Sequence, residues 1–174
     1  MMRKKPMLAY PVSAKPIDYT DKVFIQPKLD GVRCVIQANP EEGEIVAYSR
    51  TGKEWKNIDH ILKELKPFFQ KYPDVILDGE LYNHDLKNDF EKIISLVRKT
   101  KPTAEDRVES AEMVQFHCYD FIDETKTFEK RNKFLQGWFP NLDCIRDVDT
   151  RMVFNTEEVE ANHCLLYTSD AADE

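Results

Sequence analysis

The sequence predicts an α+β protein with largely antiparallel sheets, because β-rich runs alternate irregularly with segments of helical period. Residues 23–37 and 44–50 are β-rich and are separated by a turn with Pro40 and Gly43, which indicates a hairpin. The 174 residues are 41% hydrophobic and 33% charged, which is the composition of one folded domain. No dinucleotide-binding GxGxxG, Walker-type GxxxxGK[ST] or zinc-binding HExxH motif occurs.

Apolar residues on one helical face predict a helix after Asn57, the expected N-cap, and Pro67 is expected to kink or end it. This face comprises Ile58, Ile61, Leu62, Leu65 and Phe69. The apolar run 74–82 is predicted to be a strand, and residues 90–97 have the spacing of a second amphipathic helix. The polar stretch 100–110 is expected to be a loop.

The second half of the chain continues this alternation. Residues 114–122 are predicted to form a core strand and residues 127–139 a helix. Residues 145–154 are expected to form a further strand. The last helix is predicted to begin with Asn155 or Thr156 as its cap, because the acidic residues that follow favour the positive end of a helix.

Charge and hydropathy predict a cytoplasmic protein without a membrane segment. No apolar run approaches the roughly 20 residues that a span requires, and no apolar signal region follows the first basic residues. The four cysteines have neither CxxC nor zinc-ligand spacing, so we expect reduced thiols. The net charge of −7 argues against indiscriminate nucleic-acid binding but is compatible with a local basic groove.

The final segment, CLLYTSDAADE at 164–174, resembles the conceptual translation of a transposase sequencing adapter. It carries three acidic residues and no Lys or Arg, and it does not continue the preceding amphipathic pattern. We therefore expect the native sequence to be 1–163 and exclude 164–174 from the interpretation of the fold. The alternative is a natural flexible tail.

Charged residues next to apolar strand residues make QPKLDGVRC, beginning at Gln26, the main candidate for chemistry. A lysine becomes a nucleophile when desolvation or a nearby cation lowers its pKa, and Lys28 has Arg33 close in sequence. Attack on a nucleoside triphosphate also needs Mg²⁺ held by carboxylates, for which Asp30, Asp78 and Glu80 are candidates. Taken alone, Asp-Gly is more often a turn with solvated charges.

Four motifs in order resemble the covalent nucleotidyltransferases, which include ATP-dependent DNA ligases, RNA ligases and mRNA capping enzymes. They are KLDGVR at 28–33, SRTG at 49–52, LDGEL at 77–81 and FHCYDF at 116–121. The lead PMLAYPVSAKP resembles that of compact phage and bacterial DNA ligases. The resemblance implies an ATP-grasp-like adenylation domain with mostly antiparallel sheets flanked by helices, incomplete at its C-terminus.

The resemblance also assigns roles to individual residues. Lys28 would take AMP from ATP as a lysyl phosphoramidate, and Gln26, where many ligases have Glu, would contact adenine. Tyr119 would stack on adenine in place of the more usual Phe. Further nucleotide contacts are implied for Asp30, Gly31, Arg33, Arg50 and Glu80.

Some of these implied roles are more specific. Arg33 would contact ribose or phosphate, and Arg50 would bind phosphate, in ligases the 5′-phosphate of the nick. Glu80 would bind the ribose hydroxyls or the metal, and Asp30 would support the metal and the lysine. The expected cofactors are ATP and Mg²⁺, and the expected partner of this monomer is nicked double-stranded DNA.

In this family a Glu-Gly element, a Lys-x-Lys element and an oligonucleotide-binding domain follow the last helix, and none of them follows that helix in this sequence. We therefore expect 1–163 to be a partial adenylation domain of a nick-sealing enzyme, with little or no nick-sealing activity of its own. The alternatives are an RNA ligase or GTP-using capping-type enzyme, and a non-catalytic nucleotide- or DNA-binding module. Presence of Lys28 favours an enzyme over the non-catalytic module.

Overall fold

The computed structural model describes residues 4–39, 42–86, 89–139 and 142–171. Within these ranges the chain forms two compact units. The larger unit contains residues 4–6 and 29–147, and the smaller unit contains residues 7–28 and 148–171. No helix among the described residues is both long enough and apolar enough to cross a membrane.

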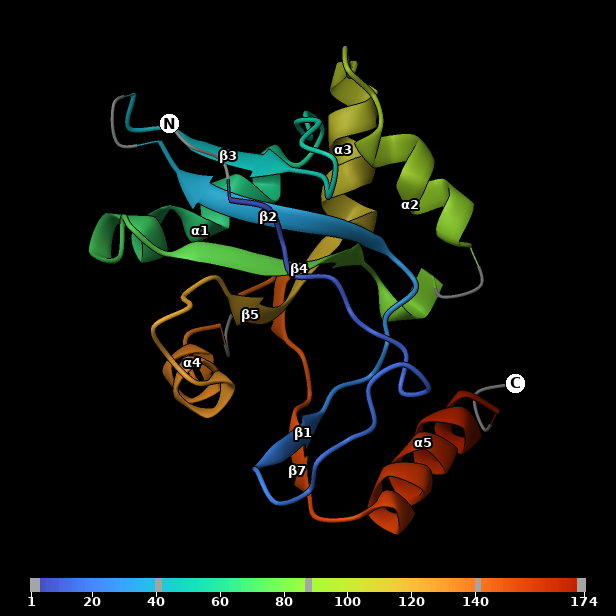
Figure 1. Cartoon of the computed structure of the whole chain (residues 1–174). Helices are drawn as coiled ribbons and strands as arrows, with labels where there is room; N and C mark the ends of the chain where they lie inside the picture. Colours follow the sequence, from blue (N-terminus) through green and yellow to red (C-terminus); the bar gives the residue numbers. More distant parts are fainter. Residues whose placement is uncertain (1–3, 40–41, 87–88, 140–141, 172–174) are drawn as a thin grey trace. The chain divides into compact units, whose positions relative to one another are not determined.

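A five-stranded sheet is the centre of the larger unit, with the order β3-β2-β4-β5-β6. Strands β3, β2, β4 and β5 are labelled in Figure 1. All neighbouring strands are antiparallel except β6, which runs parallel to β5. The mixed α+β class and the predominance of antiparallel pairing are therefore confirmed. The strands are β2 (Val32–Ala38), β3 (Ile45–Tyr48), β4 (Ile76–Tyr82), β5 (Gln115–Phe121) and β6 (Ile145–Asp147).

Alternation along the strands divides this sheet into an apolar face and a polar face. Cys34 and Ile36 of β2 and Leu77 and Leu81 of β4 belong to the main buried cluster, which also contains Phe116 of β5. Helix α1 adds Ile61, Leu65, Phe68 and Phe69 to this cluster. The residues between them on β2 and β4 point to the opposite face, which carries the charged side chains of the predicted site.

Helices of the larger unit are α1 (Asp59–Lys71), α2 (Phe90–Val97), α3 (Ala104–Met113) and α4 (Phe128–Leu135), with a short 3₁₀ turn at His84–Leu86. The prediction of a loop at 100–110 is therefore wrong. Thr103 and Asp106 form a capping box, in which the Thr103 side chain accepts from the Asp106 N–H and the Asp106 carboxylate accepts from the Thr103 N–H. Helix α3 has few apolar residues, so the helical period of its apolar residues is weak. The T-x-x-D pattern at 103–106 could nevertheless have predicted where the helix begins.

The start of α1 differs from expectation, and Pro67 does not end this helix. The N-cap is Ile58, which makes no side-chain capping bond, and Asn57 is instead buried. Its Nδ2 donates to the backbone carbonyls of Leu96 and Asp106, so it ties α2 and α3 to the start of α1. Pro67 lies inside α1, which ends four residues later at Lys71. The buried apolar face outweighs the backbone hydrogen bond that a proline removes.

The smaller unit contains β1 (Val23–Ile25), paired antiparallel with β7 (Arg151–Val153), and helix α5 (Thr156–Ala171). The predicted strands 23–37 and 145–154 are therefore each two strands that belong to different sheets. Asn155 caps α5 as expected, because its Oδ1 accepts from the Glu158 N–H at 2.8 Å. The backbone of α5 runs past residue 164, and the adapter origin of 164–174 stays a prediction.

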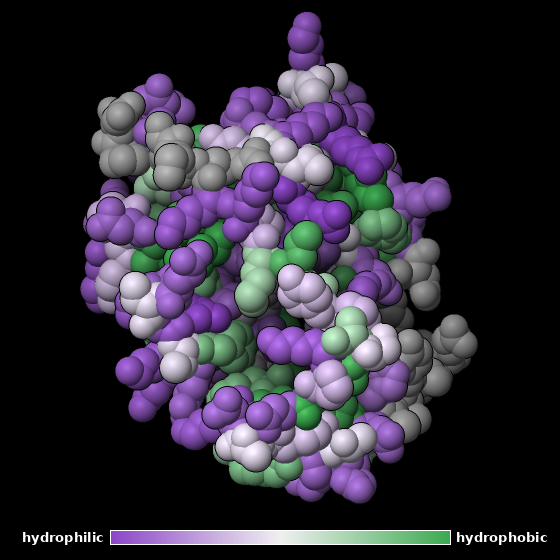
Figure 2. Space-filling model, viewed as in Figure 1, coloured by the Kyte–Doolittle hydropathy of each residue, from purple (hydrophilic) through white to green (hydrophobic). Residues whose placement is uncertain are grey.

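The surface is mainly hydrophilic on the face that Figure 2 shows, but some large apolar side chains are exposed. On this face apolar residues lie in separate patches (Figure 2). Large apolar side chains are exposed in the smaller unit, where Met7 is 76% and Tyr10 77% accessible and Phe154 is 64% accessible.

Candidate active site

The polar face of the sheet gathers predicted site residues from three strands. Arg33 of β2 is the direct cross-strand neighbour of Glu80 of β4, and Asp78 lies two residues before Glu80 on the same face. Tyr119 of β5 completes the group through contacts with Arg33 and Glu80. The sheet thus brings together Arg33, Glu80 and Tyr119 with Asp78, which the sequence also named as a candidate carboxylate.

Arg33 and Asp78 form a bidentate ion pair. Arg33 Nε donates to Asp78 Oδ1 at 2.7 Å, and Nη2 donates to Oδ2 at 2.6 Å. Burial favours a lower pKa of Arg33, but the hydrogen bonds and charge of Asp78 outweigh it, so the pKa is raised. Burial raises the pKa of Asp78, which is 5% exposed, and Arg33 acts in the opposite direction. The pair fixes the orientation of the guanidinium group.

Tyr119 lies at an irregularity of the sheet. Cys118 pairs with Gly79 but Asp120 pairs with Asp78, so Tyr119 is passed over in the register. A bulge of this kind redirects a side chain. The Arg33 Cζ lies 5.2 Å from the centre of the Tyr119 ring, and the Tyr119 hydroxyl donates to Glu80 Oε2 at 3.4 Å. Burial raises the pKa of Tyr119, so the hydroxyl remains a donor at neutral pH.

Two glycines of the motifs allow close backbone approach. A Cβ on Gly79 would lie 2.3 Å from the His117 carbonyl oxygen, and one on Gly31 would lie 2.3 Å from the Leu81 carbonyl oxygen. Neither contact is tolerable for a side chain, so both positions require glycine. Asp78 and Gly79 lie inside β4, as the strand prediction for 74–82 expects, and do not form the turn that is common for an isolated Asp-Gly pair. Gly31 likewise has a packing role in addition to the nucleotide contact that the resemblance implies.

A second group of predicted residues surrounds a basic pocket of about 460 Å³. Arg33 and Arg50 both line this pocket. Arg50 is held in a tight turn after β3, in which the Gly52 N–H donates to the Ser49 carbonyl at 2.9 Å and Gly52 has a φ of 92°. The SRTG motif is therefore a turn that presents Arg50 at the pocket.

Lys53 and Arg98 also line this pocket, and sequence reasoning missed them. Lys53 closes the same turn, because the Ser49 N–H donates to the Lys53 carbonyl at 2.7 Å. Its closeness to Arg50 in the sequence could therefore have identified it as a residue of this pocket. Arg98 is the C-cap residue of α2, and no local pattern relates it to Arg50.

The smaller unit holds Gln26 and Lys28, which follow β1. Gln26 Nε2 donates to Thr150 Oγ1 at 3.0 Å, and Thr150 Oγ1 in turn donates to the Val148 carbonyl. A glutamate in place of Gln26 could not donate to this hydroxyl, so the departure from the usual ligase residue has a structural consequence. The side chain of Lys28 is exposed, as is that of Asp30 in the larger unit.

Metal ligands are sparse among the residues that the structure describes. Within 4–39, 42–86, 89–139 and 142–171, no group of three or more His, Cys, Asp or Glu residues could hold a metal ion. Asp30 and Glu80 remain the predicted carboxylates. They fit Mg²⁺ by chemistry, because this ion binds oxygen ligands and is commonly held by one or two carboxylates together with substrate phosphates.

Comparison with known proteins gives clear similarities. A family model described as "ATP dependent DNA ligase domain" matches residues 6–164. The DNA ligase of African swine fever virus (isolate Pig/Kenya/KEN-50/1950) is 46% identical over 69 residues, which are 38% of this chain and 16% of the viral protein. The DNA ligase of the Badajoz 1971 Vero-adapted strain is also 46% identical, over 67 residues, 37% of this chain and 15% of the viral protein. The chain thus matches less than a fifth of these curated relatives.

Solved structures share the fold at low sequence identity. A structure described as "DNA binding with a minimal scaffold: Structure-function analysis of Lig E DNA ligases" has a TM-score of 0.70 at 17% identity, over 97% of this chain and 59% of that one. The ATP-dependent DNA ligase from bacteriophage T7 in complex with ATP has a TM-score of 0.55 at 16% identity, over 80% and 52% of the two chains. An archaeal ATP-dependent RNA ligase has a TM-score of 0.54 at 20% identity, over 87% and 38%. Because the family model matches nearly the whole chain, the chain belongs to the ATP-dependent DNA ligase domain family.

Proposed function

We propose that this chain carries the nucleotidyl-transfer site of an ATP-dependent DNA ligase that seals nicks in double-stranded DNA. The observation that carries the proposal is the cluster of Arg33, Glu80 and Tyr119 on one sheet face, at positions that the family motifs assign to nucleotide contacts. The match to the ATP-dependent DNA ligase domain family supports the same proposal.

In the first step Lys28 Nζ, after losing a proton, would attack the α-phosphorus of ATP. An N–P bond forms, the bond from phosphorus to the bridging oxygen breaks, and pyrophosphate leaves. Tyr119 would offer its ring to adenine, and Gln26 would contact the adenine edge. The AMP would then pass to the 5′-phosphate of the nick, and the adjacent 3′-hydroxyl would displace it.

Mg²⁺ would be held by Glu80 and Asp30, with phosphate oxygens of the substrate as further ligands. When bound, it supplies positive charge beside the phosphates that react. Arg33 is already fixed by Asp78 and would add a second positive group without further ordering of its side chain.

Adduct formation tests the nucleophile assignment. The chain is incubated with ATP and Mg²⁺, and intact-mass and peptide-mapping mass spectrometry locate any covalently bound AMP. We expect AMP on Lys28 and none on the Lys28→Ala variant. An adduct that persists in this variant contradicts the assignment. Arg33→Lys is a useful comparison, because it keeps the charge but loses the bidentate contact to Asp78.

An RNA ligase or a GTP-using capping-type enzyme is the second candidate, since an archaeal RNA ligase shares this fold. Parallel reactions with DNA or RNA nicks, and with ATP or GTP, separate these substrates. We propose DNA and ATP because the lead segment, SRTG and LDGELYNHD resemble DNA ligases most. Sealing of nicks would serve DNA replication, repair and recombination. We also propose a cytoplasmic monomer, which light scattering after size-exclusion chromatography tests for oligomeric state.

A further inference from the structure

The basic pocket is unusual for an acidic chain. Four cationic side chains line it, from Arg33, Arg50, Lys53 and Arg98, and none of the described residues that line it is a carboxylate. The sequence as a whole has a net charge of −7. Positive charge is therefore concentrated locally, which is the electrostatic pattern of an anion-binding surface.

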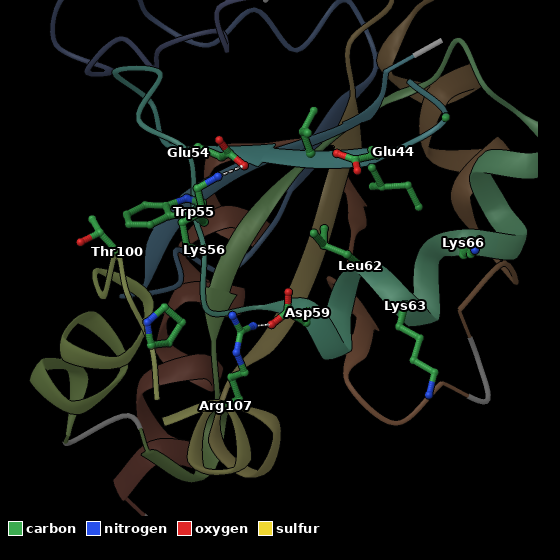
Figure 3. A pocket seen from close by; sticks show the side chains of 14 residues that line it. Glu44, Glu54, Trp55, Lys56, Asp59, Leu62, Lys63, Lys66, Thr100 and Arg107 are labelled. Carbon is green, nitrogen blue, oxygen red and sulfur yellow. Dashed lines mark ion pairs between the residues drawn. The ribbon is translucent and has the colours of Figure 1, made fainter. Parts of the chain in front are cut away.

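A second pocket in the larger unit, of about 540 Å³, provides a contrast (Figure 3). Its lining mixes acidic and basic residues. Lys56 pairs with Glu54 at 2.6 Å, and Arg107 pairs with Asp59, so much of its charge is neutralised within the protein. Its chemistry does not favour an anion in the way that the basic pocket does.

The cations of the basic pocket differ in their availability. Arg33 is bound by Asp78, as described above. Arg50, Lys53 and Arg98 are exposed and form no ion pair with any residue in the described ranges. Arg98 also lies at the C-terminal end of α2, where a cation stabilises the helix dipole, and this structural role must be separated from ligand binding.

We propose that Lys53 and Arg98, together with Arg50, bind the phosphodiester backbone of the DNA strand, so that the pocket holds the substrate by sequence-independent contacts. The inference rests on the proposed function and assigns its DNA contact to two residues outside the family motifs. A polynucleotide fits better than a free nucleotide, because the three cations are exposed at an open surface, whereas small ligands are mostly enclosed. Two cations come from one turn and the third from the end of a helix, so several phosphates can be contacted.

Salt dependence of binding tests this proposal. Binding of a fluorescein-labelled nicked duplex to the complete chain is followed by fluorescence anisotropy between about 50 and 200 mM salt. Each phosphate contact that is lost should lower the slope of log K against log salt by about 0.9. We expect this decrease for Lys53→Gln and for Arg98→Gln, and retention of the wild-type slope for Arg98→Lys.

Lys63→Gln is the matched control. Lys63 is an exposed lysine of α1 that lines the second pocket and forms no ion pair with a described residue (Figure 3). Its removal changes net charge equally and should leave the slope unchanged. Thermal unfolding of each variant shows whether Arg98→Gln destabilises α2. A loss of helix stability alone would not change the number of counterions that binding releases from the DNA, so the salt slope would stay at the wild-type value.

The outcomes separate this inference from the proposed function. A wild-type slope for Arg98→Gln, an equal decrease for Lys63→Gln, or no binding of duplex by the wild-type chain overturns the inference. Formation of AMP-Lys28 in the same preparation then leaves the proposed function standing. If no AMP adduct forms on Lys28 but binding depends on Arg98, the inference holds and the nucleotidyl-transfer assignment fails.

Discussion

Asp78 orders the proposed site through its bidentate ion pair with Arg33. Its carboxylate receives two hydrogen bonds from Arg33 and lies beside Glu80 and Tyr119. Because Asp78 is 5% exposed, its replacement removes the bidentate partner of Arg33 from a buried part of the sheet. The residue therefore links sheet packing to the geometry of the charged groups that would meet the phosphates.

We predict that Asp78→Asn lowers the free energy of unfolding by about 2 kcal/mol, because hydrogen bonds to charged groups contribute roughly 1.5–3 kcal/mol. Urea unfolding measures this change. Arg33→Gln and the double variant complete a thermodynamic cycle, and we expect a favourable coupling energy between the two sites. Additive effects of the two substitutions would show that the ion pair contributes nothing beyond its separate side chains.

At the scale of elements, α3 depends on its first turn. Thr103 satisfies the Asp106 N–H, and the Asp106 carboxylate satisfies the Thr103 N–H at 2.8 Å and also pairs with Lys99. Since Asn57 bonds to the Asp106 carbonyl, fraying of this turn would also disturb the start of α1. The capping box thus stabilises contacts among three helices.

Thr103→Ala should destabilise the larger unit by about 1 kcal/mol, the usual effect of removing an N-cap side chain. Thermal unfolding by circular dichroism measures the loss, and amide hydrogen exchange should show faster exchange in the first turn of α3. Thr103→Ser keeps the hydroxyl and serves as the control. Equal stability of the alanine and wild-type chains would contradict the role of the cap.

Sequence periodicity predicted those elements in which one face is buried. The apolar run of β4 and the helical spacing of α1 report burial directly, so both were identified. In helix α3 only Ser110 is fully buried, so its sequence has almost no helical period of apolar residues. The division of 23–37 into two sheets depends on partners far along the chain and has no local signal.

The candidate site shows the same limit. Motif residues of β2, β4 and β5 were predicted individually, and the register then brought Arg33, Glu80 and Tyr119 together. Arg98 could not be found in this way, because only the tertiary fold carries the end of α2 to the SRTG turn. Short motifs thus identify residues that act through fixed local geometry, and surface charge clusters require the structure.

At the scale of the whole molecule, a half-buried histidine links stability to pH. Burial in the sheet lowers the pKa of His117 to about 4, with the charges of Arg146 and His84 acting in the same direction. The folded chain therefore holds a neutral imidazole at a pH at which the unfolded chain, with a histidine pKa of about 6.5, is protonated. Between these two values the unfolded state binds more protons, so stability decreases as pH falls from about 6.5 to about 4.

We predict that this decrease amounts to at most about 1.4 kcal/mol per pH unit from His117, and that it is absent above about pH 7. Urea unfolding from pH 4 to 8 measures the curve, and His117→Gln should flatten it within the same window. Glutamine keeps a polar group near Gln115, which contacts His117 Nε2 at 2.9 Å. Loss of the ring contact with Tyr82 shifts the variant curve by a constant, because that contact does not titrate over this range. Parallel curves for the two chains would mean that carboxylates rather than His117 set the acid sensitivity of the fold.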